Sequence, residues 1–113
     1  DPLDGVFHAL GNACRRQILD IVKQNPGCNV NDVAEYFDIS RIAVTKHLRI
    51  LEEANLLTSE KVGRSRKLYH NPVPIQMIYD RWTTEYGALW AERLTRLKYR
   101  VESKKTKKEK PNG

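Results

Sequence analysis

The sequence predicts a mainly α-helical fold with one small β-hairpin, an α+β arrangement of about five helices. Apolar residues recur at three- and four-residue spacing through most of the chain, which is typical of amphipathic helices. Asparagine, serine and glycine stand where such helices would begin and end. One stretch near residue 63 instead has two short strand-like runs separated by a glycine turn, which predicts the hairpin.

The first three predicted helices are recognised by their ends. Asn12 is placed to cap the second helix, which Pro26-Gly27 terminates. Asn29 is placed to cap the third helix, and Asp32 three residues later completes a capping box. The first helix ends at Gly11. Its apolar face consists of Leu3, Val6, Phe7 and Leu10.

A fourth helix is predicted from Ser40 to about Asn55. Serine is a good N-cap, and asparagine tolerates the left-handed conformation that often follows a helix end. At about 100° per residue, Val44, Leu48 and Leu51 share one narrow buried face. The opposite face is polar and basic. It consists of Arg41, Ile42, Thr45, Lys46 and Arg49, and Ser40 at the start of the helix is counted with them as a candidate DNA contact.

Two helices joined by a turn of a few residues form the helix-turn-helix pattern. The outward face of the fourth helix has no packing reason to be basic, whereas a helix in the major groove directs such residues at base edges. Ile42 fits this interpretation, because a thymine methyl group would give it an apolar partner. The alternative is a solvated face with an incidental isoleucine. His47, on the flank of the core face, is expected to be half-buried and is not assigned a DNA contact.

A basic hairpin follows the fourth helix. Residues 56–62 and 66–70 form strand-like runs, and Gly63 supplies the positive φ that closes a hairpin. Narrow minor grooves attract arginine and phosphates attract lysine, so the hairpin is interpreted as a DNA-binding wing. The alternative is a solvated edge, because edge strands often carry lysine. The basic residues of the wing are Arg64, Arg66 and Lys67.

A final long helix is predicted from near Ile75 to residue 102. It has two apolar faces, so it is expected to pack on its own domain and on a second copy of the chain. A single intramolecular core stripe is the alternative. Together with the first helix, this helix predicts a dimer interface made of Leu3, Phe7, Ile78, Trp82, Tyr86, Leu89 and Trp90.

The predicted organisation is one DNA-binding and dimerisation domain over residues 1–102 and a basic, disordered tail over 103–113. The tail is rich in lysine and has no apolar stripe, which favours disorder and non-specific attraction to DNA. The 113 residues suit one domain. Lys+Arg total 20 against 14 Asp+Glu, a net charge of +6, and this balance suits a polyanionic partner.

The sequence has neither a membrane-span pattern nor a signal-peptide pattern, and this limits the compartment expected for the protein. No apolar run approaches the ~18 residues of a membrane span, and no signal-peptide pattern opens the chain, so a cytoplasmic, nucleoid-associated protein is expected. Cys14 and Cys28 are then reduced by default and are interpreted as small core residues. The alternative is a thiol switch at Cys14 or Cys28. The position of Cys14 at a helix start beside two arginines favours its thiolate.

No enzymatic motif occurs in the sequence: it has no glycine-rich phosphate loop, nucleophile elbow or paired acidic residues of catalytic spacing, and no cofactor is expected. The rival interpretation is a winged-helix module that binds protein instead of DNA. Such a module would present an apolar recognition surface, whereas this chain presents Arg41, Lys46, Arg49 and Arg64.

Four motifs of the sequence are informative together: Ala9-Leu10-Gly11-Asn12, Asp32-Val33-Ala34, Gly63-Arg64 and, most specifically, Ser-x-x-x-Val-Thr-x-His-Leu-x-x-Leu at 40–51. Through these motifs the chain resembles, over roughly residues 3 to 102, the ArsR/SmtB family of bacterial winged-helix repressors. The resemblance implies a homodimer, usually a repressor, whose recognition helices enter successive major grooves of a pseudo-palindromic operator. It places DNA contacts at Arg41, Ile42, Thr45 and Lys46, the face that helical spacing selects independently.

The family's metal sites are not matched. Its best-known site has two cysteines where this chain has Asn29 and Asn31, and a neutral amide cannot replace thiolate for soft metals. Its other site uses carboxylates and histidines on the last helix, and no histidine occurs between Ile75 and Glu102. The segment 71–82 is similar to a branch of the family without these sites, so no metal is expected.

Overall fold

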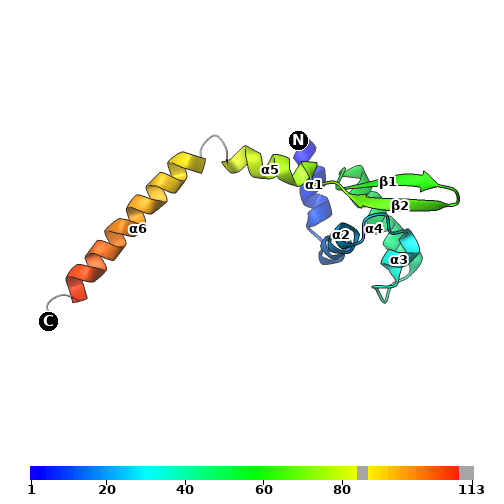
Figure 1. The fold of residues 1–113 in the computed structure, drawn as a ribbon, viewed down its shortest axis with the longest axis horizontal. Helices are drawn as coiled ribbons and strands as arrows, with labels where there is room; N and C mark the ends of the chain where they lie inside the picture. The colour runs from blue at the N-terminus through cyan, green and yellow to red at the C-terminus, as the bar shows by residue number, and fades with distance from the viewer. Residues whose placement is uncertain (84–86, 110–113) are drawn as a thin grey trace. The chain divides into compact units, whose positions relative to one another are not determined.

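The computed structural model describes residues 1–83 and 87–109, with side chains described at 1–83 and 90–103. It comprises two compact units, Asp1–Gln76 and the residues from Met77 onward, and each is described by itself. The elements in Figure 1 are α1 (Pro2–Leu10), α2 (Ala13–Gln24), α3 (Val30–Ala34), α4 (Arg41–Glu53), β1 (Leu57–Val62), β2 (Ser65–His70), α5 (Val73–Thr83) and α6 (Gly87–Glu109).

Side-chain caps start α2, α3 and α4, as the sequence predicted. The Asn12 and Ser40 side chains each accept a hydrogen bond from the backbone N–H three residues on, at 3.1 Å. Asn29 Oδ1 accepts from the Asp32 N–H at 2.8 Å, and Asp32 Oδ2 accepts from the Asn29 N–H at 2.9 Å, which completes the capping box. These bonds satisfy N–H groups that have no partner within their own helix.

The core of the first unit lies among α1, α2, α4 and the base of the hairpin. The predicted buried face of α4 is confirmed, because Val44, Leu48 and Leu51 are all buried. Val33 is the buried residue of α3 and lies in the same core. The other large side chains that are completely buried are Ile18, Val22, Leu56, Leu57 and Leu68.

The hairpin is the predicted wing, and its strands pair in a continuous antiparallel register. The pairing runs from Leu57 opposite His70 at the base to Val62 opposite Ser65 at the tip. Gly63 turns the chain with φ +63°, a conformation that favours glycine. Only the base is buried, since the outer residues of both strands are exposed. Figure 1 shows the hairpin projecting from the helices of the first unit.

A backbone contact with the segment before α3 holds the base of the wing. The Leu68 N–H donates to the Cys28 carbonyl and the Leu68 carbonyl accepts from the Gly27 N–H, each at 2.8 Å. Cys28 and Leu68 form an isolated antiparallel bridge. The helix-turn-helix and the wing are therefore joined by backbone hydrogen bonds as well as by the core.

The C-terminal part differs from the predicted single long helix. The structure describes two helices, α5 and α6, and residues 84–86 between them lie outside the described residues, so six helices are described instead of about five. The first starts at Val73 instead of near Ile75, because proline at the second position is compatible with the first turn of a helix.

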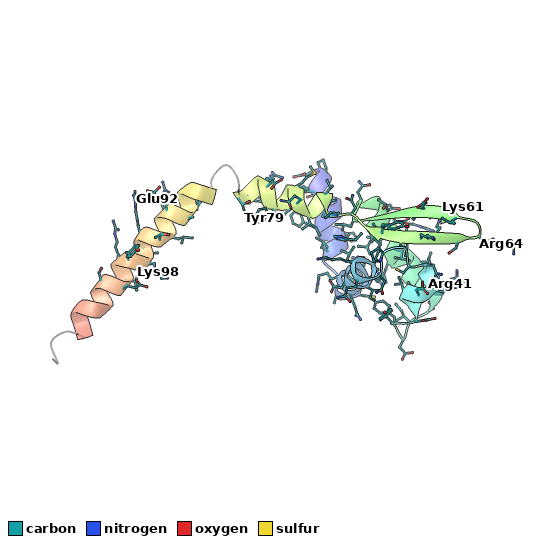
Figure 2. All side chains as sticks on the ribbon, viewed as in Figure 1. Arg41, Lys61, Arg64, Tyr79, Glu92 and Lys98 are labelled. Carbon is teal, nitrogen blue, oxygen red and sulfur yellow. The ribbon has the colours of Figure 1, made fainter. Side chains whose placement is uncertain are left out.

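The predicted boundary between domain and tail at residue 102 lies within α6, which continues through Glu109. Lysine and glutamate are good helix formers, and no proline occurs between Gly87 and Pro111 to stop the helix. Exposed ion pairs one turn apart, Glu92–Arg96 and Lys98–Glu102, also favour a helix here. Figure 2 labels Glu92 and Lys98 on α6. No helix in the described part of the chain is long and apolar enough to cross a membrane.

Candidate nucleic-acid interface

The outward face of α4 is exposed, as the helical spacing predicted. Ile42 is 71% exposed, far more than a core isoleucine would be. The Thr45 hydroxyl donates to the Arg41 carbonyl at 2.9 Å, so its remaining capacity toward an outside group is as an acceptor. The structure brings the predicted set together around one shallow hollow of about 280 Å³, lined by Arg41, Ile42, Thr45, Lys46 and Arg49.

Ser40 and His47 have roles within the protein. Ser40 lies in the predicted DNA-contact set, but its hydroxyl caps α4 and so determines where the recognition helix begins. His47 is half-buried, as predicted. Ser40 therefore determines the start of the helix, and His47 contacts Arg15 of α2 through its Nδ1.

The wing carries its cations along exposed positions. Arg64, Arg66 and Lys67 are all exposed. Lys61 on β1, labelled with Arg64 in Figure 2, adds a fourth exposed cation that the sequence pattern did not single out. Arg66 lies 3.9 Å from Glu52 of α4, at the outer limit of an ion pair. Lys61 was missed because a lone strand lysine is also what a solvated edge would carry.

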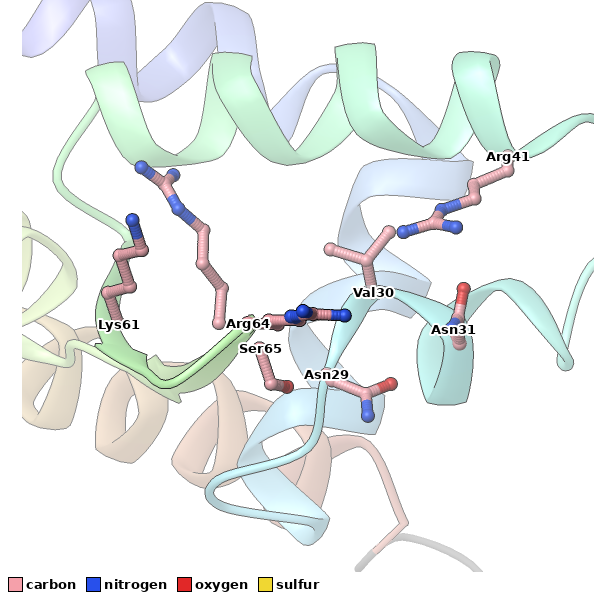
Figure 3. Close-up of a pocket in the computed structure, with 8 residues that line it drawn as sticks. Asn29, Val30, Asn31, Arg41, Lys61, Arg64 and Ser65 are labelled. Carbon is pink, nitrogen blue, oxygen red and sulfur yellow. The ribbon is translucent and has the colours of Figure 1, made fainter.

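A pocket of about 510 Å³ lies between the start of α3, the start of α4 and the wing. Figure 3 shows the side chains of Arg41 and Arg64 extending toward Val30 from different elements. None of its lining residues is acidic. They are Asn29, Val30, Asn31, Arg41, Lys61, Arg64, Ser65 and Arg66.

The chemistry of this region does not favour a metal ion. The oxygen of the Asn29 side chain is engaged in the α3 cap, which directs its amide N–H donors, not an acceptor, to other partners. Among the described residues no group of three His, Cys, Asp or Glu side chains is arranged to hold a metal. The cationic surroundings would further repel a metal cation.

The two cysteines differ in their surroundings. Cys28 is buried, and its burial raises the pKa of its thiol above 9.0, with the nearby Asp32 charge raising it further. The reactive thiolate is therefore disfavoured at Cys28. Cys14 is half-buried near the start of α2.

The predicted dimer-interface residues divide between the two units. In the first, Phe7 is exposed and Leu3 half-buried. In the second, Trp82 and Trp90 are 56% and 57% exposed, and Ile78 is half-buried. Contiguous exposed apolar patches mark interaction sites, whereas single exposed apolar side chains are common on any protein surface. The side chains of Tyr86 and Leu89 lie outside the described residues.

Comparison with known proteins gives consistent matches. The family model described as bacterial regulatory protein, arsR family, matches residues 14–59. The uncharacterized HTH-type transcriptional regulator YuzN of Bacillus subtilis (strain 168) is 34% identical over 85 residues, which cover 70% of this chain and 92% of YuzN. The transcriptional repressor SdpR of the same organism is 34% identical over 62 residues, 55% of this chain and 68% of SdpR.

The fold is also similar to that of a solved structure. An ArsR-like transcriptional regulator from Rhodococcus sp. RHA1 is similar with a TM-score of 0.69 and 30% sequence identity. The similarity covers 90% of this chain and 92% of that chain.

Proposed function

This chain belongs to the arsR family of bacterial regulatory proteins, and we propose that it acts there as a homodimeric repressor of a pseudo-palindromic operator. As a member of that family it is a DNA-binding transcriptional regulator with a winged helix-turn-helix fold, and not an enzyme. The proposal therefore concerns the residues that contact DNA, the assembly and the regulatory outcome.

The observation that carries the proposal is a set of cations on α4 and the wing that have no ion-pair partner among the described residues. Within the described residues, no ion pair engages any of Arg41, Lys46, Arg49, Lys61 and Arg64. Unpaired cations next to one another repel, and a polyanion that binds them removes this cost while releasing its own counterions. DNA is the polyanion that a regulator of this family binds.

We assign sequence reading to the middle of α4 and backbone attraction to the wing. Ile42 is placed to contact a thymine methyl, and Thr45 and Lys46 to bond with base edges. Arg49 lies at the edge of the same hollow. Arg64, with Arg66 and Lys67, would enter the minor groove or bind phosphates.

A homodimer is supported by the exposed apolar residues and by the information that DNA recognition requires. A single recognition helix reads too few base pairs to compete with the many other sites of a genome. Two copies with recognition helices ~34 Å apart read two half-sites one helical turn apart. Burying a large aromatic such as Trp82 or Trp90 contributes on the order of 2–3 kcal/mol, and two-fold symmetry doubles each contribution.

Repression follows from occupancy in this proposal. A dimer bound across a promoter excludes the transcription machinery by its presence, so repression requires DNA binding alone. SdpR, one of the similar proteins, is named a transcriptional repressor. The proposed place of action is the bacterial cytoplasm, on the nucleoid.

The decisive experiment combines assembly with operator binding. Genomic footprinting of the full chain should yield sites with two inverted half-sites about one helical turn apart. Sedimentation equilibrium should give twice the 13.1 kDa monomer mass without DNA. Only monomers at micromolar concentration, or single half-sites, would disprove the two-half-site mechanism.

A matched pair of variants tests the interface. Trp90→Glu should produce monomers and lose operator binding in parallel, because a charge replaces an apolar contact. Tyr99→Glu is the control, because a separation of nine residues places it on the opposite face of α6. Equal dimerisation of the two variants would exclude the Trp90 face from the interface.

A further inference from the structure

The pocket between α3, α4 and the wing has the composition of an anion site. Four cations, Arg41, Lys61, Arg64 and Arg66, share its lining with two asparagines and a serine. Only Arg66 has an ion-pair partner among the described residues, and that carboxylate lies 3.9 Å away. The lining thus offers several N–H and O–H donors and three uncompensated charges.

The polar residues of the pocket favour a phosphate group over a carboxylate group. Asn29 has its oxygen engaged in the α3 cap, so its amide N–H donors are what it can offer an outside group. Ser65 at the wing tip can donate its hydroxyl, and arginine presents a planar fork of donors. Several donors arranged around one volume match a group with oxygens on more than one side, which describes a phosphate better than a carboxylate.

The place of the pocket in the fold indicates where that phosphate comes from. A recognition helix in the major groove and a wing in the adjacent minor groove are separated by one sugar–phosphate strand, because that strand is the boundary between the grooves. The pocket lies between α4 and the wing (Figure 3). This reasoning rests on the proposed function, since it takes α4 and the wing as the two DNA-contacting elements.

We propose that this pocket is a phosphate site, and that the DNA strand between the two grooves occupies it in the operator complex. Arg41 is then a phosphate ligand, although it shares the outward face of α4 with the base-reading residues. Lys61, which lies on the wing outside the helix-turn-helix, is then also a ligand of the DNA phosphate. The site chemistry also admits a free phosphorylated compound, which would compete with DNA.

The first arm of the test measures binding of a free phosphate. Inorganic pyrophosphate is titrated into the ¹⁵N-labelled full chain at constant ionic strength, with side-chain amide and arginine Nε signals observed. Saturable shifts are expected at Asn29, Asn31, Arg41 and Arg64, weakened about tenfold in Arg64→Ala through loss of a charge-assisted contact. Lys23→Ala is the charge-matched control, because Lys23 does not line the pocket.

The second arm measures binding to duplex DNA at graded salt. Lys61→Ala and Arg41→Ala should each reduce the slope of log K against log salt by about 0.9, one phosphate contact, and leave the ratio of operator to random-DNA affinity unchanged. Saturable pyrophosphate shifts without a slope change would contradict occupancy by the DNA strand and would assign the phosphate site to a free phosphorylated compound.

Two further outcomes would overturn the inference. One is pyrophosphate shifts that do not saturate, or that are equal in Arg64→Ala and Lys23→Ala, which indicates adventitious ion binding only. The other is an unchanged salt slope of operator binding in both DNA variants, combined with no saturable pyrophosphate shift. The proposed function would still hold in that case, because the operator is bound. If operator binding itself fails, the pyrophosphate arm still decides whether the pocket binds phosphate.

Discussion

Arg15 of α2 contacts His47 of the recognition helix, with the arginine Nη1 3.3 Å from the histidine Nδ1. Arginine has only donors, so Nδ1 is the acceptor of this contact. The same guanidinium donates from Nε to the Ala9 carbonyl at 2.8 Å and from Nη2 to the His8 carbonyl at 3.0 Å. Arg15 is only 8% exposed. One buried side chain therefore connects the last turn of α1 to α4.

Replacing Arg15 should destabilise the fold strongly. Arg15→Met retains most of the apolar stem but leaves buried carbonyls of α1 without a donor, and we expect a loss of about 2–3 kcal/mol in the free energy of unfolding. Arg16→Met is the control, because the exposed Arg16 makes a similar bond to the Leu10 carbonyl at 2.7 Å and should cost under about 1 kcal/mol. Urea denaturation gives both values, and equal losses would contradict the importance of burial.

The start of the recognition helix depends on the Ser40 hydroxyl. Ser40→Ala removes the acceptor for the Ala43 N–H and should cost about 1 kcal/mol, whereas Ser40→Gly should cost only a few tenths. Thermal denaturation measures both. If Ser40→Ala is as stable as the parent but loses DNA affinity, then Ser40 contacts DNA directly and capping is not its main role.

Base reading and phosphate binding should separate by mutation. Ile42→Ala or Thr45→Ala should reduce discrimination between operator and altered sites by about 1–3 kcal/mol per affected base pair. Arg64→Ala should instead weaken operator and random DNA alike. Competition binding with single-base operator variants makes this comparison. Unchanged preference in both α4 variants would show that the assigned face does not read sequence.

His70 at the base of the wing should make stability depend on pH. Burial lowers the pKa of His70 below 6.5, and the positive charge of Lys23 lowers it further. The folded state therefore binds this proton less tightly than the unfolded state. The stabilising contribution is complete above the unfolded pKa of about 6.5 and is lost as the pH falls through the folded pKa.

An NMR titration of His70 checks this prediction directly. Lys23→Gln should raise the measured pKa of His70 without restoring 6.5, because burial is the larger cause. His70→Asn should remove this part of the pH dependence of unfolding. A pKa at or above 6.5 in the parent protein would contradict the description of the site.

The two cysteines should react at different rates with a disulfide reagent at neutral pH. Cys28 is buried and its pKa is raised, so it should react slowly and only through opening of the fold. Cys14 is half-buried and should react first. Cys14→Ser should therefore abolish the fast phase, and in urea both thiols should react alike. A fast phase that persists in Cys14→Ser would revive Cys28 as a thiol switch.

Local signals in the sequence were enough to predict the helix-turn-helix. The caps at Asn12, Asn29 and Ser40 and the buried face of α4 were confirmed, because each depends on residues within one turn of each other. The turn conformations at Asn55, with φ +60°, and at Gly63 were confirmed for the same reason. Side-chain chemistry over three or four residues determines these features.

Features that depend on distant contacts were missed. The buried contacts of Arg15 were not predicted, because its acceptors on α1 and α4 come together only in the folded chain. Lys61 gained significance only when the wing was placed beside Arg41. The helix through Glu109 was missed for another reason, since a lysine-rich composition is compatible with both a helix and a disordered tail.

The way the wing is held has a consequence for how such a regulator can change over generations. Leu57 and Leu68 at the base are buried, whereas Lys61, Arg64 and Lys67 lie on exposed positions away from the core. Surface substitutions at such positions usually alter stability by less than about 0.5 kcal/mol. A lineage can therefore gain or lose charge at the wing, and so retune affinity for DNA, while the recognition helix keeps its sequence preference.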